Sequence, residues 1–242
     1  MRVNVLGSSS SGNGYVITIG GESVIIECGL PPREALRAVN YQADTVKAIF
    51  VSHEHGDHAK YIDDYAFMFH CPIYTTSSLA EHHNAISVEG KCMKWQRAGD
   101  GSFLFMPFRT KHDCESYGYV IRHPSFGNIF FGTDTYAYPC VFKGIDFFLI
   151  EANYNDDLIQ TLDEPRKKRL LVSHMSIAYC EKYLARCRAE RAKGIMLIHL
   201  SAGNSNAKAF KDRIHRRFGV ECWIADKKTT AEIDDNETTT AV

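Results

Sequence analysis

The sequence lacks three features that would assign its class at once. It has no run of about 18 apolar residues that could span a membrane, and no two cysteines stand in the CxxC spacing. It also has no excess of charge, because 28 Lys and Arg residues stand against 29 Asp and Glu, which excludes capture of nucleic acid by overall charge but not by a local basic patch. The apolar run at the start is too short for a signal peptide. Eight scattered cysteines in a chain too large to need disulfides are expected to be mostly buried free thiols in a reducing cytoplasm.

The composition is that of an ordinary globular protein, and 242 residues are enough to bury a sizeable core. Apolar runs bounded by turn residues predict strands at 3–6, 15–19, 23–28, 48–51, 73–75, 103–108, 117–122, 128–131, 147–150, 195–198 and 222–224. Helical spacing predicts helices at 33–39, 61–70, 79–83, 156–162, 177–192 and 207–218. No repeat or linker divides this pattern, which predicts two packed sheets covered by helices. We expect a single domain, residues 1–226, and a polar disordered tail, residues 227–242.

Eleven histidines are a generous number for this length, and three of them fall in one segment. The apolar run 48–51 leads directly into His53-x-His55-x-Asp57-His58. Two histidines separated by one residue point to the same side of an extended segment and can reach one metal ion. A following turn then lets Asp57 and His58 reach a second ion. Because so many ligand-type residues rarely meet at one strand end by accident, the segment predicts a metal site.

A site with two metal ions needs further ligands, which should also follow strands. Three residues fit: His112 after run 103–108, Asp134 after run 128–131 and His199 after run 195–198. Each alone has an ordinary alternative, as a structural histidine or as an aspartate in a turn. Their recurrence at the ends of three separate apolar runs favours the interpretation as ligands.

Taken together, these residues resemble the metallo-β-lactamase superfamily of dinuclear metallohydrolases, from about residue 3 to about residue 215. Segments 7–13, 52–58, 112–113, 151–154, 173–176 and 199–204 are similar to the motifs of its YycJ/WalJ-like branch. Members of that branch are regarded as phosphodiesterase-type hydrolases with exonuclease activity on DNA. The resemblance implies a four-layer αββα sandwich with the site at one edge between the sheets.

The resemblance also implies how two divalent ions are held. His53, His55 and His112 would bind one ion, Asp57, His58 and His199 the other, and Asp134 would bridge the two. Histidine at position 55, where an electron-transfer diiron protein would have an acid, favours Zn²⁺, with Mn²⁺ as the alternative. Glu27 stands where the superfamily usually has Asp, at a position that supports the metal loop from outside, so its longer side chain leaves the local geometry open.

The chemistry expected of such a site is phosphodiester hydrolysis. Two divalent ions about 3.5–4 Å apart share a hydroxide that attacks at neutral pH, and Asp57 is its natural hydrogen-bond acceptor. His174 lies just before the predicted helix 177–192, with Ser176 as that helix's cap. Because a helix N-terminus favours anions, His174 is expected to contact a phosphate or to protonate the leaving oxygen, and its structural alternative is to cap the loop.

Weaker signals concern the substrate, which we expect to be DNA or RNA cleaved by an exonuclease-like reaction. Ser10, Ser11 and Asn13 follow the first strand and are expected to contact a phosphate, although such runs often form simple turns. Basic residues cluster at 166–169, 186–193 and 213–217. If these clusters flank the site, they would make nucleic-acid binding salt-dependent, and otherwise they form solvated faces.

Two other functions stay open. A small-molecule hydrolase could use the same ions to cleave a thioester, lactone or β-lactam, which an apolar enclosed pocket and a dispensable His174 would favour. A metal-stabilised binding module without turnover is the third hypothesis, in which Glu27 has spoiled the geometry of the site. The sequence has no long basic insertion rich in Gly and Pro of the kind that would grip a tRNA.

Overall fold

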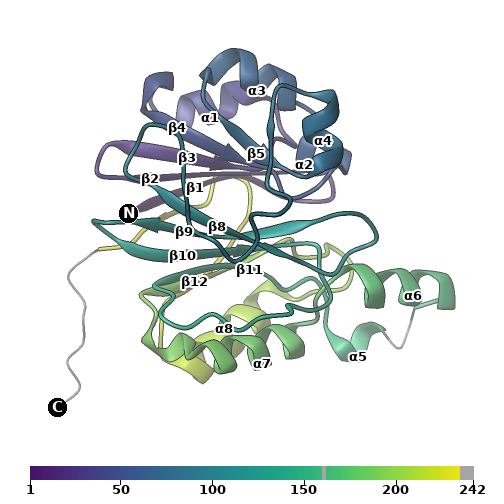
Figure 1. Ribbon diagram of the computed structural model, residues 1–242. Coiled ribbons are helices and arrows are strands. Elements are labelled where there is room, and N and C mark those ends of the chain that lie inside the picture. The colour runs from purple at the N-terminus through teal and green to yellow at the C-terminus, as the bar shows by residue number, and fades with distance from the viewer. Residues whose placement is uncertain (160–161, 235–242) are drawn as a thin grey trace.

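The computed structural model of the protein describes residues 1–159 and 162–234. Two seven-stranded sheets pack face to face, and helices cover the outer face of each sheet (Figure 1). The four-layer αββα sandwich that the resemblance implies is therefore confirmed.

The first sheet has the strand order β14-β1-β2-β3-β4-β5-β6. Its strands are β1 (Arg2–Ser9), β2 (Gly12–Ile19), β3 (Glu22–Ile26), β4 (Val46–Phe50), β5 (Ile73–Thr75), β6 (Ile86–Ser87) and β14 (Thr230–Glu232). The helices on its side of the molecule are α1 (Pro32–Ala38), α2 (Gly56–Ala59), α3 (Ile62–Phe69) and α4 (Ser77–His82) (Figure 1). From β3 to β6 the strands pair in parallel, so their carboxyl ends lie at one edge.

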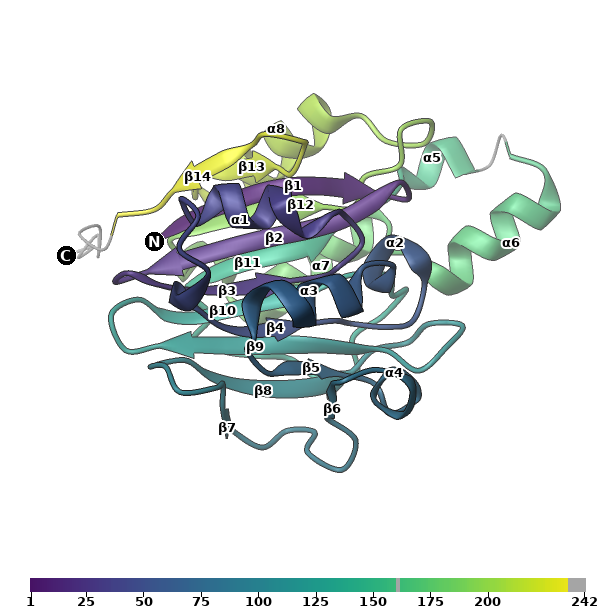
Figure 2. The same ribbon diagram turned by 90° about the horizontal axis from the view of Figure 1, so that it is seen from above.

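The second sheet has the order β13-β12-β11-β10-β9-β8-β7. Its strands are β7 (Gln96–Arg97), β8 (Leu104–Arg109), β9 (Tyr117–His123), β10 (Gly127–Gly132), β11 (Phe147–Glu151), β12 (Gly194–Ile198) and β13 (Cys222–Ile224). Helices α7 (Ile177–Cys187) and α8 (Ala207–Phe218) cover it, and α5 (Asp156–Ile159) and α6 (Glu164–Ser173) extend to one side (Figures 1 and 2). β10, β11 and β12 are parallel, which again brings strand ends together.

The apolar run 48–51, at the end of strand β4, contains no alternating polar residue because both faces of the strand are covered. Ala48 and Phe50 belong to the core between the two sheets, whereas Ile49 and Val51 pack in the core under the helices of the first sheet. A strand covered on both faces needs apolar side chains in both directions. From the opposite sheet, Phe105 packs on Phe50 with ring centroids 5.1 Å apart.

Two predicted helices differ from the structure, and one longer helix was missed. The helix predicted at 177–192 ends at Cys187, because Arg188 adopts a left-handed conformation with φ of 61° and a short 3₁₀ turn, Ala189–Arg191, follows. Of the helix predicted at 156–162, the structure shows α5 up to Ile159, and residues 160–161 lie outside the described part. Helix α6 was not predicted at all.

The prediction of a disordered tail from residue 227 is wrong for residues 227–234. Thr230–Glu232 pairs with β1 as an antiparallel edge strand, and the buried side chains of Ala231 and Ile233 join the central core. Backbone pairing and two apolar side chains suffice to order a segment that looks polar in the sequence. The rest of the predicted tail, 235–242, lies outside the described residues.

Two expectations about the chain as a whole can be compared with the structure. All eight cysteines are free, as predicted, but four rather than most of them are buried, Cys28, Cys180, Cys187 and Cys222, and the other four are half-buried. Every helix in the described part of the chain is too short or too polar to traverse a bilayer.

Phe105→Ala should lower the free energy of unfolding by about 3–5 kcal/mol, because it removes a fully buried ring and leaves a cavity between the sheets. Phe67→Ala is the matched control, since the Phe67 side chain on α3 is 80% exposed and its loss should change stability little. Urea unfolding followed by circular dichroism measures both. Equal losses in the two variants would show that the centre of the core lies elsewhere.

Candidate metal centre

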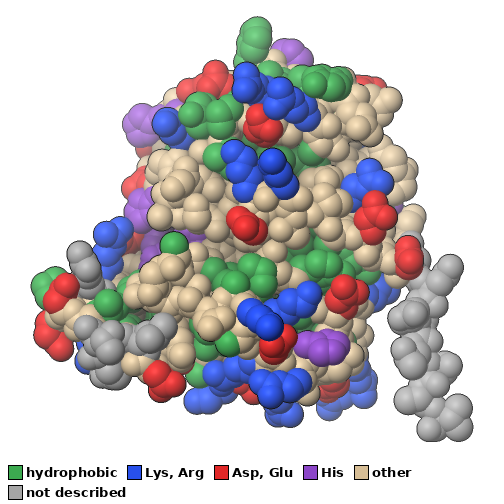
Figure 3. Space-filling view, turned by 180° about the vertical axis from the view of Figure 1, so that it is seen from behind, with side chains coloured by type: hydrophobic (Ala, Val, Ile, Leu, Met, Phe, Trp, Pro, Cys, Tyr) green, Lys and Arg blue, Asp and Glu red, His purple; other side chains and the backbone are tan. Residues whose placement is uncertain are grey.

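The candidate site lies where loops from both sheets meet at one edge of the sandwich. The segment after β4 is fixed to the second sheet by two hydrogen bonds, from the Tyr117 N–H to the Ser52 carbonyl (3.0 Å) and from the Tyr119 hydroxyl to the Val51 carbonyl (2.9 Å). Asp134 and His199 follow the ends of β10 and β12 in that sheet. The seven predicted ligands, which are His53, His55, Asp57, His58, His112, Asp134 and His199, all belong to ligand groups at this edge. Histidine side chains gather along one edge of the molecular surface (Figure 3).

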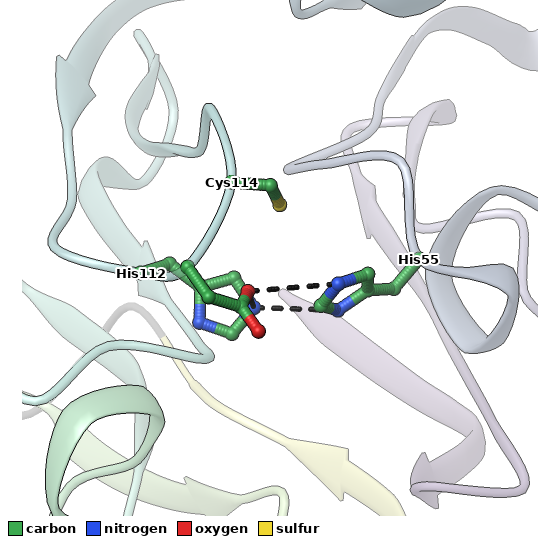
Figure 4. A group of neighbouring side chains, drawn as sticks. His55, His112 and Cys114 are labelled. Carbon is green, nitrogen blue, oxygen red and sulfur yellow. Dashed lines mark hydrogen bonds and ion pairs between the residues drawn. The ribbon is translucent and has the colours of Figure 1, made fainter. Parts of the chain in front are cut away.

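Three imidazoles form the first part of the site. His53 Nε2 lies 3.1 Å from His55 Nδ1, and His112 Nε2 lies 3.3 Å from the same nitrogen. Figure 4 shows the rings of His55 and His112 facing each other across a short gap. Ligand atoms at about 2.0–2.1 Å from a tetrahedral Zn²⁺ are separated by about 3.3–3.4 Å. The observed spacing therefore fits three ligands of one ion.

The second part contains Asp57, His58 and His199, whose ligand atoms form one group. Asp57 Oδ2 lies 3.3 Å from His58 Nε2 and 3.7 Å from His199 Nε2. His199 Nε2 is buried and has no hydrogen-bond partner among the described residues. A buried polar nitrogen without a partner is costly unless something binds it, so this atom also fits a metal ligand.

Asp134 lies between the two parts. Its Oδ2 is 2.9 Å from His58 Nε2, and it forms a ligand group with His53 and His58. Its Oδ1 is 3.5 Å from His199 Nδ1. This position is the one expected of a bridging carboxylate.

Burial and charge oppose each other in this cluster. Burial alone would raise the pKa of Asp134, but His199 and His58 hold that pKa well below its usual range. Likewise burial alone would lower the pKa of His199, but the Asp134 and Asp57 carboxylates raise it to about 10. Carboxylates that hold protons on neighbouring imidazoles can hold a divalent cation in place of those protons.

Glu27 lies behind the loop that carries His53, His55, Asp57 and His58. The side chain is fully buried, its Oε2 accepts a hydrogen bond from the Ser52 N–H (3.2 Å), and its Oε1 lies 3.3 Å from His58 Nδ1. The longer side chain is accommodated with Glu27 in the left-handed region, at φ of 68°. It therefore orients the His58 ring from the side away from the cluster.

Asn13 lies elsewhere than expected. Its side chain is buried, donates to the Asp57 main-chain oxygen and to Asp57 Oδ2 (both 3.3 Å), and lies 3.0 Å from His58 Nε2. These contacts hold the metal loop instead of facing the substrate. Ser10 and Ser11 do line the cleft above the site.

His174 lies beside the cluster at the end of α6. Its Nδ1 is 2.7 Å from Glu151 Oε1 and 3.2 Å from Asp134 Oδ1. Ser176 caps α7 as predicted, because its hydroxyl accepts from the Tyr179 N–H. Burial would lower the pKa of His174, but the Glu151 carboxylate outweighs burial and raises it.

Glu151 is a site residue that the sequence analysis did not single out. It ends β11, is fully buried, accepts from the Thr135 N–H (3.0 Å) and lies 3.3 Å from His199 Nδ1. It thus orients both His174 and His199. The sequence feature that could have identified Glu151 is its position directly after the apolar run 147–150, because Asp134 was identified as an acidic residue that follows such a run.

Asp113 and Cys114 were also not predicted. They form a ligand group with His55 and His112, and the Cys114 thiol lies to one side of these two rings (Figure 4). Burial is the main cause that raises the pKa of Cys114 to about 12, and Asp113 adds to it.

A cleft of about 700 Å³ opens above the cluster. Its lining is mostly polar and includes Ser9, Ser10, Ser11, His55, Asp57, His112, Asp134, Asn153, Arg169, His174, His199, Ser201 and Asn204. A cleft of this size lies within the range of small-molecule sites, about 300–1,000 Å³.

The chain is similar to known proteins in family, sequence and fold. Residues 9–126 match the family model of the metallo-beta-lactamase superfamily. The exodeoxyribonuclease WalJ of Streptococcus pneumoniae serotype 2 is 24% identical over 230 residues, which cover 84% of this chain and 83% of that protein. The exodeoxyribonuclease YycJ of Bacillus anthracis is 25% identical over 223 residues, covering 85% and 84%. The crystal structure of the metallo-beta-lactamase fold protein YhfI from Bacillus subtilis superposes with a TM-score of 0.73 at 19% identity, over 95% of this chain and 98% of that one.

The domain match over residues 9–126, the fold and these relatives together place the protein in the class of metallo-β-lactamase fold hydrolases. Within the superfamily, its sequence is similar to WalJ and YycJ over most of its length.

Asp134→Asn should lower the metal content of the purified protein below two ions per chain, because the amide has the same shape but only one oxygen and no charge to share between two ions. Asp44→Asn is the matched control, since Asp44 is exposed on the 3₁₀ turn Ala43–Thr45. Inductively coupled plasma mass spectrometry after gel filtration gives the stoichiometry. If the Asp134→Asn variant retained two ions per chain, Asp134 would not be needed to bridge them.

Proposed function

We propose that the protein is a dinuclear metal-dependent phosphodiesterase that cleaves nucleic acid, in an exonuclease-like manner. The observation that carries this proposal is the meeting of five predicted ligands with His174 in one polar cleft, beneath which the other two, His53 and His58, are buried. The names of the two curated relatives, both exodeoxyribonucleases, favour DNA as the substrate.

In this proposal His53, His55 and His112 hold one ion, Asp57, His58 and His199 hold the other, and Asp134 contacts both. When bound, two divalent ions supply a nucleophile at neutral pH and neutralise charge on the phosphate. The mixture of imidazole and carboxylate ligands suits Zn²⁺, and also admits Mn²⁺.

The residues of the chain position the reacting groups. Asp57 is partly exposed to the cleft, where its carboxylate can accept a hydrogen bond from the attacking water. His174 Nδ1 is held by Glu151 at 2.7 Å, which leaves its Nε2 as the ring nitrogen available to the cleft. From there Nε2 can donate a hydrogen bond to a phosphate oxygen, or a proton to the leaving oxygen. Ser10 and Ser11 face the same cleft and can bind the phosphate's other oxygens.

The polar lining also bears on the other two hypotheses. A thioester, lactone or β-lactam hydrolase would be favoured by an apolar enclosed pocket, but polar and charged side chains outnumber the apolar ones in this cleft, which are Leu162, Leu170, Leu200 and Ala202. The binding-module hypothesis required that Glu27 disturb the site, whereas Glu27 fits behind His58. Neither alternative therefore gains support.

Removal and return of the metal tests the proposed function. Chelation should abolish hydrolysis of bis-p-nitrophenyl phosphate and of end-labelled DNA, and Zn²⁺ or Mn²⁺ should restore both, because the nucleophile depends on the ions. Thioester and lactone substrates are measured in parallel. Two bound ions with thioester or lactone cleavage and no phosphodiester cleavage would replace this proposal with the small-molecule hydrolase, and no turnover of any ester would favour a binding module.

His174→Ala should keep both ions but lower the rate of phosphodiester cleavage by about 10²- to 10⁴-fold, the usual contribution of a general acid. His215→Ala is the control, since His215 is exposed on α8 and contacts only the Val220 carbonyl. Metal content and initial rates are measured on the same samples. If His174→Ala cleaved at the wild-type rate, His174 would have no catalytic role and would only cap the loop.

A further inference from the structure

Helix α6 separates two clefts and presents a different face to each. Arg169, Leu170 and Ser173, with His174 directly after the helix, line the cleft above the metal centre. The other face, with Glu164, Pro165, Lys167, Lys168, Leu171 and Val172, lines a separate cleft of about 580 Å³. In Figure 2 helix α6 projects from the body of the molecule. α6 is therefore a wall of the metal cleft.

Arg169 is the one Lys or Arg among the described residues that line the metal cleft. Its side chain is exposed, and it makes no ion pair or hydrogen bond with any described residue. Other arginines in the structure are paired: Arg213 with Glu181 at 2.6 Å and Arg109 with Glu115 at 3.2 Å. An unpaired guanidinium at the rim of a cleft is free to bind an anion, and its fork of donors matches phosphate.

The other basic clusters lie farther from the site. α7 begins at Ile177, three residues after His174, and its 11 residues carry the chain about 16 Å along the helix axis before Arg188. Arg213 and Arg217 both pair with Glu181, so part of that charge is already neutralised. Arg169 on α6 is thus the basic residue of these clusters that reaches the cleft in the described part of the chain.

The position of Arg169 along α6 indicates which phosphate it can meet. Arg169 precedes His174 by five residues, about 7.5 Å of helix rise. The His174 N–H donates to the Leu170 carbonyl, so His174 stays attached to the last turn of α6 and lies on the same wall of the cleft as Arg169. A guanidinium displaced in this way from His174 can reach a phosphate next to the one that His174 contacts.

We propose that Arg169 binds the phosphate next to the scissile one and thereby makes the enzyme act on strands with several phosphates in preference to a single diester. This inference rests on the proposed function. Arg169 is a positioning and specificity residue in this scheme, with Ser10 and Ser11 on the same cleft available to the scissile phosphate.

The test compares Arg169→Ala with Lys168→Ala, which removes the same charge one residue away, from the face that lines the other cleft. Arg169→Ala should raise KM for a short single-stranded DNA about 10- to 100-fold, the usual effect of losing a hydrogen bond to a charged group. The change with bis-p-nitrophenyl phosphate should be much smaller. Arg169→Lys should restore part of the affinity, and Lys168→Ala should behave like wild type on both substrates.

A second readout is the salt dependence of binding, measured by fluorescence anisotropy with a cleavage-resistant phosphorothioate DNA from about 50 to about 200 mM salt. Arg169→Ala should reduce the slope of log affinity against log salt by about 0.7, the value for one phosphate contact on a single strand. Equal effects of Arg169→Ala and Lys168→Ala on KM and slope, or equal losses on both substrates, would overturn the inference while the enzyme stays a phosphodiesterase. A wild-type protein that cleaves neither substrate would overturn the proposed function itself.

Discussion

The contact between His58 and Asp134, 2.9 Å from Nε2 to Oδ2, connects the two sheets at the point on which the site depends. His58 belongs to the loop and short helix that follow β4, whereas Asp134 follows β10 of the opposite sheet. Both side chains are buried, and removing two charges from water costs several kcal/mol per ion unless each finds partners. The partners are Glu27 and Asn13 beside His58, and His199 beside Asp134. These polar groups stabilise the charges of His58 and Asp134 at the edge of an otherwise apolar core.

Backbone strain at the same edge shows that the geometry is imposed by the surrounding structure. Asp134 and His199 have φ of 44° and 54°, a region that costs a residue with a side chain about 1–3 kcal/mol. Hydrogen bonds hold His199 in this conformation: its N–H donates to the Ser8 hydroxyl (2.8 Å), and Asn153 Nδ2 donates to its carbonyl (2.8 Å). The conformation aims both side chains back toward the cluster after their strands end. Strain of this kind is typical of functional sites, because the alternative unstrained backbone would point these ligands elsewhere.

The sequence predicted the parts of the structure that depend on local patterns. The run 48–51 followed by His53 and His55 identified a buried strand and two imidazoles that converge beyond its end, because residues separated by one position in an extended segment point to the same side. Helix α6 escaped prediction since its apolar residues, Leu170, Leu171 and Val172, are consecutive and form no helical stripe, and two of them are exposed. The double role of Glu151 toward His174 and His199 depends on contacts over 23 and 48 positions, which one sequence does not reveal.

A net charge of −1 constrains how this protein can hold a nucleic acid. With no global field, attraction must come from cations close to the bound strand, and at about 0.1 M salt charges more than about 10 Å apart on the surface are largely screened. The arginines near the end of α7 lie beyond that distance along the helix, so their charge contributes little at the cleft. In the proposed function, specific binding would depend on the metal ions and on the few donors that line the cleft, among which Arg169 carries the positive charge. A neutral nuclease of this kind would not be held along duplex DNA by overall charge, which would suit a reaction that begins at a strand end.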